Sequence, residues 1–233
     1  MKKTIAITEE VLKEWSNNLG LVLEKQNRVP VMVLSALSME TLSEDVPEGF
    51  YLGKQMVTMK AYPVTHGTFF VQSEITRRKK IKKSEYIFCQ TMVNDAKGQT
   101  VLSIETVLVK PEEPINVTES PAIDETQKEE ECSFVFFAEQ VQQFCRLSGD
   151  PNPIHQTERP VVPGMMLLLA FEEAFLKKVT DISKVTVHYI HPLYSGEKAE
   201  INEVPRGFSI EAAGRNIASI IISGGIKDEK IKD

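Results

Sequence analysis

The most informative stretch of this chain is Ser148-Gly149-Asp150-Pro151-Asn152-Pro153-Ile154-His155. It places a carboxylate and an imidazole five residues apart, in a segment too rich in proline and glycine to be helical. Soon afterwards, residues 161–169 read Val-Val-Pro-Gly-Met-Met-Leu-Leu-Leu, a run that is typical of the start of a buried helix. The two stretches together predict a loop whose acid–base pair faces a helix N-terminus.

The surroundings of this loop follow a pattern that occurs twice in the chain. Each half opens with an amphipathic helix, expected at residues 8–19 and 138–147, and Thr8 is placed to cap the first of them. A Val-Pro step then leads into an apolar helix at residues 29–30 and again at residues 162–163. Proline is favoured at the first position of a helix because its missing N–H would be unpaired there in any case.

Strands are expected after each apolar helix, because β-branched residues alternate with polar ones and turn residues separate the runs. The expected strands are residues 57–63, 68–76, 84–93 and 100–109 in the first half, and 185–192, 197–204, 208–213 and 216–224 in the second. Each half is therefore predicted to be an α+β unit, in which an antiparallel sheet wraps one long buried helix.

An acidic, proline-containing segment separates the two halves. Residues 111–131 hold three prolines, eight acidic side chains and few apolar ones, so they cannot bury enough surface to offset the entropy of ordering. The sequence thus predicts an N-terminal unit at residues 1–110, a linker at 111–131 and a C-terminal unit at 132–233.

Composition narrows the class of protein. The chain has 233 residues, a formal net charge of −6 and a hydrophobic share of 42%. These values are typical of a globular protein with a sizeable core, and they argue against a nucleic-acid partner. Three cysteines without CxxC spacing favour neither a disulfide framework nor a zinc site. We find no signal segment and no apolar run of membrane-spanning length, so the expected location is the cytoplasm.

The quoted loop, with Phe137-Ala138 before it and Pro163-Gly164-Met165 after it, resembles the MaoC-like, (R)-specific enoyl-CoA hydratases and dehydratases of the hotdog superfamily. The motif of a small residue and Gly-Asp-x-Asn-Pro-hydrophobic-His is specific, because several residues with restrictive backbone chemistry occur together. The resemblance is strongest over residues 137–169. In the first half it extends only to the layout, which looks like the degenerate N-terminal hotdog of double-hotdog members. It implies two tandem hotdog folds.

The resemblance also implies a lyase that works without a metal or redox cofactor. It hydrates trans-2-enoyl thioesters to 3-hydroxyacyl thioesters, or runs the reverse dehydration, in fatty acid metabolism. Asp150 and His155 would hold and activate the catalytic water, and the Gly164 backbone N–H would hydrogen-bond the thioester carbonyl. Asn152 would help to orient the loop and, with Pro163 and Met165, would bind the substrate. The substrate would be an acyl-CoA or an acyl-carrier-protein thioester.

The chemistry of these residue types agrees with those roles. An enoyl thioester needs a base for the water that attacks C3 and an acid that protonates C2. Charge that builds on the thioester oxygen is stabilised by the free N–H groups and the positive dipole end of a helix. Glycine at that helix start would let the carbonyl approach the backbone.

Two departures from the family pattern are visible. The family usually has Asp or Asn two residues after the histidine, whereas this chain has Thr157. The family also has a longer segment between the histidine and the glycine, whereas here only residues 156–163 separate them. The short segment favours an alternative, a non-catalytic acyl-thioester-binding or assembly subunit. An acyl-CoA thioesterase is a third hypothesis, since other hotdog branches hydrolyse thioesters.

Simpler interpretations also stay open for individual residues. The Asp150 loop could be a surface Asx-turn with an incidental histidine, and Gly164 could only be a small residue at a crowded helix start. His188 and His191 lie three apart on a strand and so face opposite sides, which argues against a metal site. Trp15 is expected in the core.

The basic run at residues 77–83 is either a solvated hairpin turn or a surface that attracts coenzyme A phosphates or an acidic carrier protein. No nucleic-acid partner is expected, because aromatic residues do not interleave the run. No membrane partner is expected, because no apolar run approaches membrane-spanning length. Hotdog sheets pair edge to edge, so the two halves could mimic a homodimer, and association of two chains into a homodimer is also possible.

Overall fold

Two apolar helices form the centre of the structure, a computed structural model that describes residues 1–23, 29–43, 45–61, 66–112, 132–175 and 182–224. They are α2 (Val31–Ser43) and α4 (Gly164–Ala174), and they contact each other. Both are apolar on nearly every side, which is the pattern of helices that neighbouring elements surround. Met32, Val33 and Leu34 of α2 and Leu168 of α4 are fully buried.

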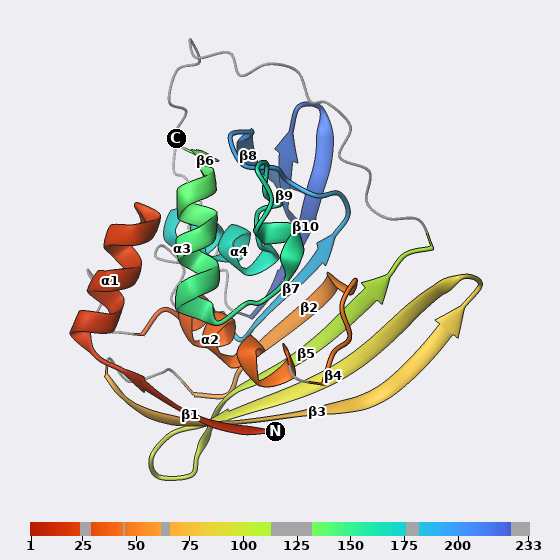
Figure 1. The fold of residues 1–233 in the computed structure, drawn as a ribbon. Coiled ribbons are helices and arrows are strands. Elements are labelled where there is room, and N and C mark those ends of the chain that lie inside the picture. Colours follow the sequence, from red (N-terminus) through yellow and green to blue (C-terminus); the bar gives the residue numbers. More distant parts are fainter. Residues whose placement is uncertain (24–28, 44, 62–65, 113–131, 176–181, 225–233) are drawn as a thin grey trace.

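A ten-stranded antiparallel sheet wraps these helices (Figure 1). The strands are β1 (Lys2–Ile7), β2 (Tyr51–Met59), β3 (Gly67–Ile81), β4 (Ser84–Asn94), β5 (Thr100–Lys110), β6 (Ser133–Val135), β7 (Lys184–Tyr189), β8 (Lys198–Val204), β9 (Gly207–Ala212) and β10 (Arg215–Ser223). Their order is β1-β3-β4-β5-β2-β7-β10-β9-β8-β6. All strands of the first half thus lie on one side of the β2–β7 junction, and all strands of the second half lie on the other.

The β2–β7 pair joins the two halves into one sheet. Its register runs from Lys54 opposite His188 to Thr58 opposite Lys184. Val57 and Val185 face each other within this pair and are fully buried. The predicted fold class, two tandem hotdog units that each have a central helix and an antiparallel sheet, is confirmed by this arrangement together with the comparisons below.

Two amphipathic helices pack on the outside of the core. Helix α1 (Glu9–Leu19) starts after Thr8, whose Oγ1 accepts a hydrogen bond from the Val11 N–H at 3.3 Å, as predicted. Helix α3 (Ala138–Ser148) lies against it, and the rings of Trp15 and Phe144 meet edge to face with centroids 5.6 Å apart. Trp15 is 1% exposed, so its predicted place in the core is confirmed.

Some elements differ from the sequence expectation. Strand β6 was not predicted, because three residues are too few for a clear periodic signal. Strand β1 was not predicted either, because only Ile5 and Ile7 near its end are buried, so its alternation is short. Helices α2 and α4 begin one residue after Pro30 and Pro163, so neither proline is the first helical residue. Of the strand expected at residues 57–63, the first three residues form the end of β2, which begins at Tyr51 and ends at Met59, and residues 62–63 lie outside the described residues.

The expected linker lies outside the described residues from position 113 onward. Among the helices that the structure does describe, none has the length and hydropathy needed to cross a membrane.

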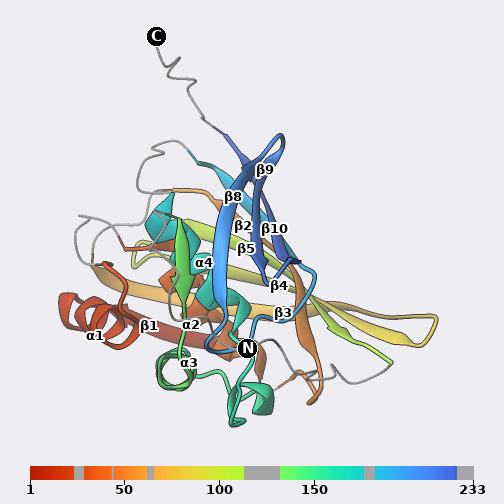
Figure 2. The same cartoon turned by 90° about the horizontal axis from the view of Figure 1, so that it is seen from above.

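The hairpin formed by β3 and β4 projects beyond the end of β1, which pairs with β3 only as far as Gln72, whereas β5 pairs with β4 as far as Glu85 (Figures 1 and 2). We call its outer part, residues 77–83, the basic arm. The side chains of the arm are exposed throughout. Arg78 donates a hydrogen bond from Nη2 to the Asp45 carbonyl at 3.0 Å, which ties the base of the arm to the loop after α2.

Candidate active site

The loop that carries the predicted acid–base pair is built from local capping interactions. Helix α3 ends at Gly149, whose φ of 70° lies in the left-handed region that glycine tolerates. The Asp150 N–H then donates to the Cys145 carbonyl at 3.0 Å. Asp150 Oδ1 accepts from the Asn152 N–H at 3.0 Å, which closes an Asx-turn. The second carboxylate oxygen of Asp150 is therefore left to face His155.

Asn152 fixes the loop in two further ways. Its Oδ1 accepts from the Ile154 N–H at 3.4 Å at the start of the short 3₁₀ helix η1 (Pro153–His155). Its Nδ2 donates to the Phe50 carbonyl of the first half at 3.3 Å. Asn152 thus connects the motif loop to the other half of the chain, a contact that the loop sequence alone did not reveal.

Asp150 and His155 are brought together. His155 Nε2 lies 3.5 Å from Asp150 Oδ2, and the imidazole is buried whereas the carboxylate is partly exposed. His155 Nδ1 is 2.6 Å from the Val161 carbonyl oxygen. A carbonyl can only accept, so Nδ1 carries the hydrogen, and in the neutral ring Nε2 is the free base that faces Asp150.

The charge state of His155 follows from its surroundings. Burial lowers the pKa of His155 below its ordinary value, while the Asp150 carboxylate and the Val161 carbonyl act in the opposite direction. The net effect lowers the pKa of His155, because burial outweighs these two opposing contacts. His155 is therefore neutral near pH 7 and can accept a proton, which is what a general base requires.

Gly164 is the first residue of α4 and lies in the wall of the same cavity. A Cβ on Gly164 would lie 2.6 Å from Tyr189 Cε1 and 3.1 Å from Leu52 Cδ2. The Tyr189 hydroxyl also donates to the Gly164 carbonyl at 3.2 Å. Close packing against Tyr189 is thus a sufficient reason for glycine here. The expected hydrogen bond from the Gly164 backbone N–H to a substrate carbonyl stays a prediction.

A cavity of about 770 Å³ collects all six predicted site residues. They are Asp150, Asn152, His155, Pro163, Gly164 and Met165. This volume is within the range of pockets that hold small organic ligands. The first half contributes much of the wall, including Met39, Leu42, Phe50, Leu52 and Leu108.

The cavity also contains residues that were not predicted. Tyr189 is the last residue of β7 and its side chain reaches the start of α4; burial raises its pKa, so its hydroxyl keeps its proton. Ser148 precedes the motif glycine, and its buried Oγ has no hydrogen-bond partner among the described residues. Glu40 of α2 reaches the cavity and pairs with Lys3. Of these three residues, only Ser148 could have been predicted from the sequence, because it directly precedes the motif.

The two other histidines considered above do not gather into a metal centre. His191 lines the cavity, whereas His188 is exposed on β7. Within the described ranges, no cluster of three or more His, Cys, Asp or Glu residues could hold a metal ion.

Comparison with known proteins identifies the fold as a double hotdog. No family model and no curated protein matches the sequence. The structure is similar to HtdX from Mycobacterium tuberculosis at a TM-score of 0.74 and 13% identity, covering 95% of this chain and 98% of that one. A MaoC-like dehydratase from Phytophthora capsici gives a TM-score of 0.72 at 15% identity, with 100% and 96% covered.

A third similar structure, a conserved hypothetical protein from Mycobacterium tuberculosis, is described as a double hotdog fold. It gives a TM-score of 0.67 at 10% identity and covers 96% of this chain and 93% of its own. MaoC-like dehydratases are therefore among the structural neighbours of this chain. At these identities the likeness establishes the fold.

Proposed function

We propose that this chain hydrates trans-2-enoyl thioesters to 3-hydroxyacyl thioesters, or catalyses the reverse dehydration. The observation that carries the proposal is that Nε2 of His155 lies 3.5 Å from the Asp150 carboxylate, in a cavity that Gly164 of α4 also lines. The structural neighbours that are named MaoC-like dehydratases add support at the level of the fold.

In the forward reaction, Asp150 and His155 hold one water molecule between them. His155 Nε2 takes a proton from that water as its oxygen bonds to C3 of the enoyl group. The electrons of the C2–C3 double bond move toward the thioester. C2 then receives the proton that the Asp150–His155 pair took from the water. One water is added in total, and each side chain returns to its starting charge.

The negative charge that develops on the thioester oxygen needs a donor. At the first residue of a helix the backbone N–H has no partner within the helix, and Gly164 holds this position in α4. Such a donor in a site shielded from water typically contributes on the order of 3 kcal/mol to transition-state stabilisation. Pro163 and Met165, on either side of Gly164 in the cavity wall, are proposed to contact the thioester.

The two halves have different parts in this proposal. The C-terminal unit, residues 132–233, supplies the reacting groups. The N-terminal unit, residues 1–110, supplies the apolar wall along which an acyl chain would lie, with Met39 and Leu42 of α2 and Leu52 of β2 among its members. Methionine adapts its shape to flexible chains, which suits this use.

The proposed substrate is a thioester of coenzyme A or of an acyl carrier protein, both of which are anionic. The basic arm offers a positive surface in an otherwise acidic chain, and the Arg78 bond to the Asp45 carbonyl places its base beside the loop whose next residues line the cavity. Such a surface would raise the rate of encounter with an anionic substrate.

A non-catalytic thioester-binding subunit is the second candidate, and the short segment between His155 and Gly164 favours it. The two functions are separated by mixing the protein with crotonyl-CoA and with longer trans-2-enoyl-CoAs and following the enoyl absorbance. Loss of absorbance supports the hydratase, saturable binding without loss supports the binding subunit, and release of free thiol would support a thioesterase.

A further inference from the structure

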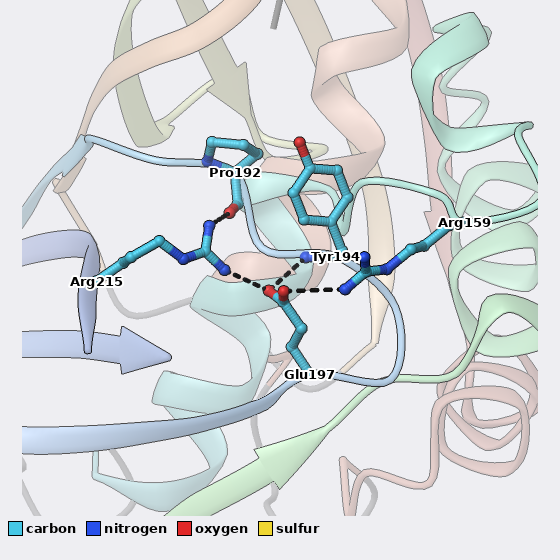
Figure 3. A network of polar contacts seen from close by, with 5 residues as sticks. All are labelled: Arg159, Pro192, Tyr194, Glu197 and Arg215. Carbon is cyan, nitrogen blue, oxygen red and sulfur yellow. Dashed lines mark hydrogen bonds and ion pairs between the residues drawn. The ribbon is translucent and has the colours of Figure 1, made fainter. Parts of the chain in front are cut away.

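An ionic network with a buried carboxylate at its centre includes Arg159 of the short segment 156–163 (Figure 3). At its centre is Glu197, whose side chain is 8% exposed. Oε1 of Glu197 accepts from Arg159 Nη2 at 3.1 Å, and Oε2 accepts from Arg215 Nη2 at 2.8 Å. The Tyr194 backbone N–H donates to Oε2 at 3.1 Å. One carboxylate thus holds together the short segment, the turn before β8 and the start of β10.

The same turn, residues 193–195, also binds the short segment through backbone hydrogen bonds. The Val162 N–H donates to the Leu193 carbonyl at 2.8 Å, and the Ser195 N–H donates to the Pro160 carbonyl at 2.9 Å. Residues 160–162 therefore lie against residues 193–195 much as two strands do. Arg215 secures the turn further, because its Nη1 donates to the Pro192 carbonyl at 3.1 Å.

The other side of the segment reaches the candidate active site. The Val161 carbonyl accepts the Nδ1–H of His155 at 2.6 Å, and the Val161 N–H donates to the Ile154 carbonyl at 3.1 Å. The position of this one carbonyl decides which ring nitrogen of His155 carries the hydrogen. Anything that fixes the path of residues 160–162 also fixes that tautomer.

We propose that Glu197 is a positioning residue for His155, acting through Arg159 and the turn at residues 193–195 to hold the Val161 carbonyl. This inference deepens the proposed function and rests on it for its catalytic consequence. The network lies at the short segment between His155 and Gly164 and fixes the path that this segment takes. Without the Glu197 carboxylate, the guanidinium groups of Arg159 and Arg215 would face each other uncompensated, and the segment would lose its anchor.

The experiment records ¹⁵N spectra of His155 in the full chain, labelled at histidine, for the native protein and for Glu197→Gln and Arg159→Met. Arg159 is one-third exposed, so Arg159→Met keeps the aliphatic stem while removing the link. Glu200→Gln is the matched control, since Glu200 lies on β8 and pairs with Lys198 at 3.2 Å. Folding of every variant is checked by circular dichroism.

The native protein and Glu200→Gln should show the single Nδ1–H tautomer, while Glu197→Gln and Arg159→Met should show a mixture of both tautomers. A merely structural role would lower the unfolding temperature and leave the tautomer unchanged, and that result in folded variants would overturn the proposal. If Glu197→Gln does not fold, Arg159→Met decides alone.

Turnover is then measured separately on an enoyl thioester. The kcat of both network variants should fall about tenfold or more, as is usual when the partner that orients a functional histidine is lost. A tautomer change in a protein that hydrates no enoyl thioester would support the positioning role and would refute the proposed function. The two claims therefore fail in distinguishable ways.

Discussion

Replacement of Gly164 by alanine should destabilise the protein by about 1–3 kcal/mol, the usual range for forcing an extra methyl into a packed site. The new Cβ would lie 2.6 Å from Tyr189 Cε1 and 2.8 Å from Cζ. Carbon atoms attract one another best at about 3.5–4.0 Å, so α4 or the tyrosine ring would have to move by about 1 Å. A displacement of that size at a reacting centre also costs about 100-fold in rate.

The assay is urea unfolding of Gly164→Ala, Tyr189→Leu and the double variant, followed by the fluorescence of Trp15, the single tryptophan of the chain. Tyr189→Leu removes the ring that the methyl strikes, and it also removes the hydroxyl that bonds to the Gly164 carbonyl. The double variant should be more stable than the sum of the single effects by about 1–2 kcal/mol, because the two residues are in contact.

Gly67→Ala is the control for this cycle. Among the residues that the structure describes, a Cβ at Gly67 would meet only the Phe69 ring, at 3.9 Å, so the change should stay within about 0.5 kcal/mol. Additive effects of the Gly164 and Tyr189 substitutions would refute the packing argument. So would a Gly164→Ala protein of native stability.

Three further results are expected. The free energy of unfolding should decrease as the pH falls below about 6.5, because His155 binds a proton more readily in the unfolded chain than in the folded one, where burial lowers its pKa. Urea titrations at several pH values should show that the free energy of unfolding depends less on pH in His155→Gln. The same pH dependence in both proteins would contradict this. Burial raises the pKa of Cys89 to about 11 and of Cys145 to about 12, so both thiols should react slowly with a disulfide reagent until urea unfolds the protein, and fast labelling of either in the folded state would contradict their burial. Replacing Lys79 and Lys82 of the basic arm by glutamine should lower kcat/KM for an anionic enoyl thioester by about tenfold at low salt, which is the lower end of the effect of electrostatic steering. The difference in kcat/KM should vanish at high salt. A difference that persists at high salt would exclude a steering role.

Much of the architecture could be predicted because the signals were local. The apolar runs of α2 and α4 have no polar face, and the α1 cap at Thr8 is a side-chain property that the sequence displays directly. Other features depend on contacts between residues that are distant in sequence. The pairing of β2 with β7 is decided by how two separate buried faces meet, and no residue in either strand encodes that partner by itself.

The residues of the candidate site also fall into two groups, those that a local sequence signal predicts and those that depend on contacts between distant residues. The Asp150 and His155 pair was predictable, since turn chemistry and the quoted motif place both in one loop. Tyr189 and Phe50 were not predicted, because each reaches the site from another part of the chain: Tyr189 packs against Gly164 and Phe50 accepts from Asn152. The importance of Glu197 depends on three donors that come from separate segments, and only the three-dimensional structure brings them together.

Hydration of crotonyl-CoA and of longer trans-2-enoyl-CoAs, followed by the loss of enoyl absorbance, tests the central claim most directly. The native protein should turn over at least one of these substrates. Asp150→Asn and His155→Ala should fold normally and lose at least about 100-fold in kcat, the lower bound for a general acid–base group. Native-like turnover in either variant would contradict the roles assigned to Asp150 and His155, as would a native protein inactive toward every chain length on both coenzyme A and carrier protein.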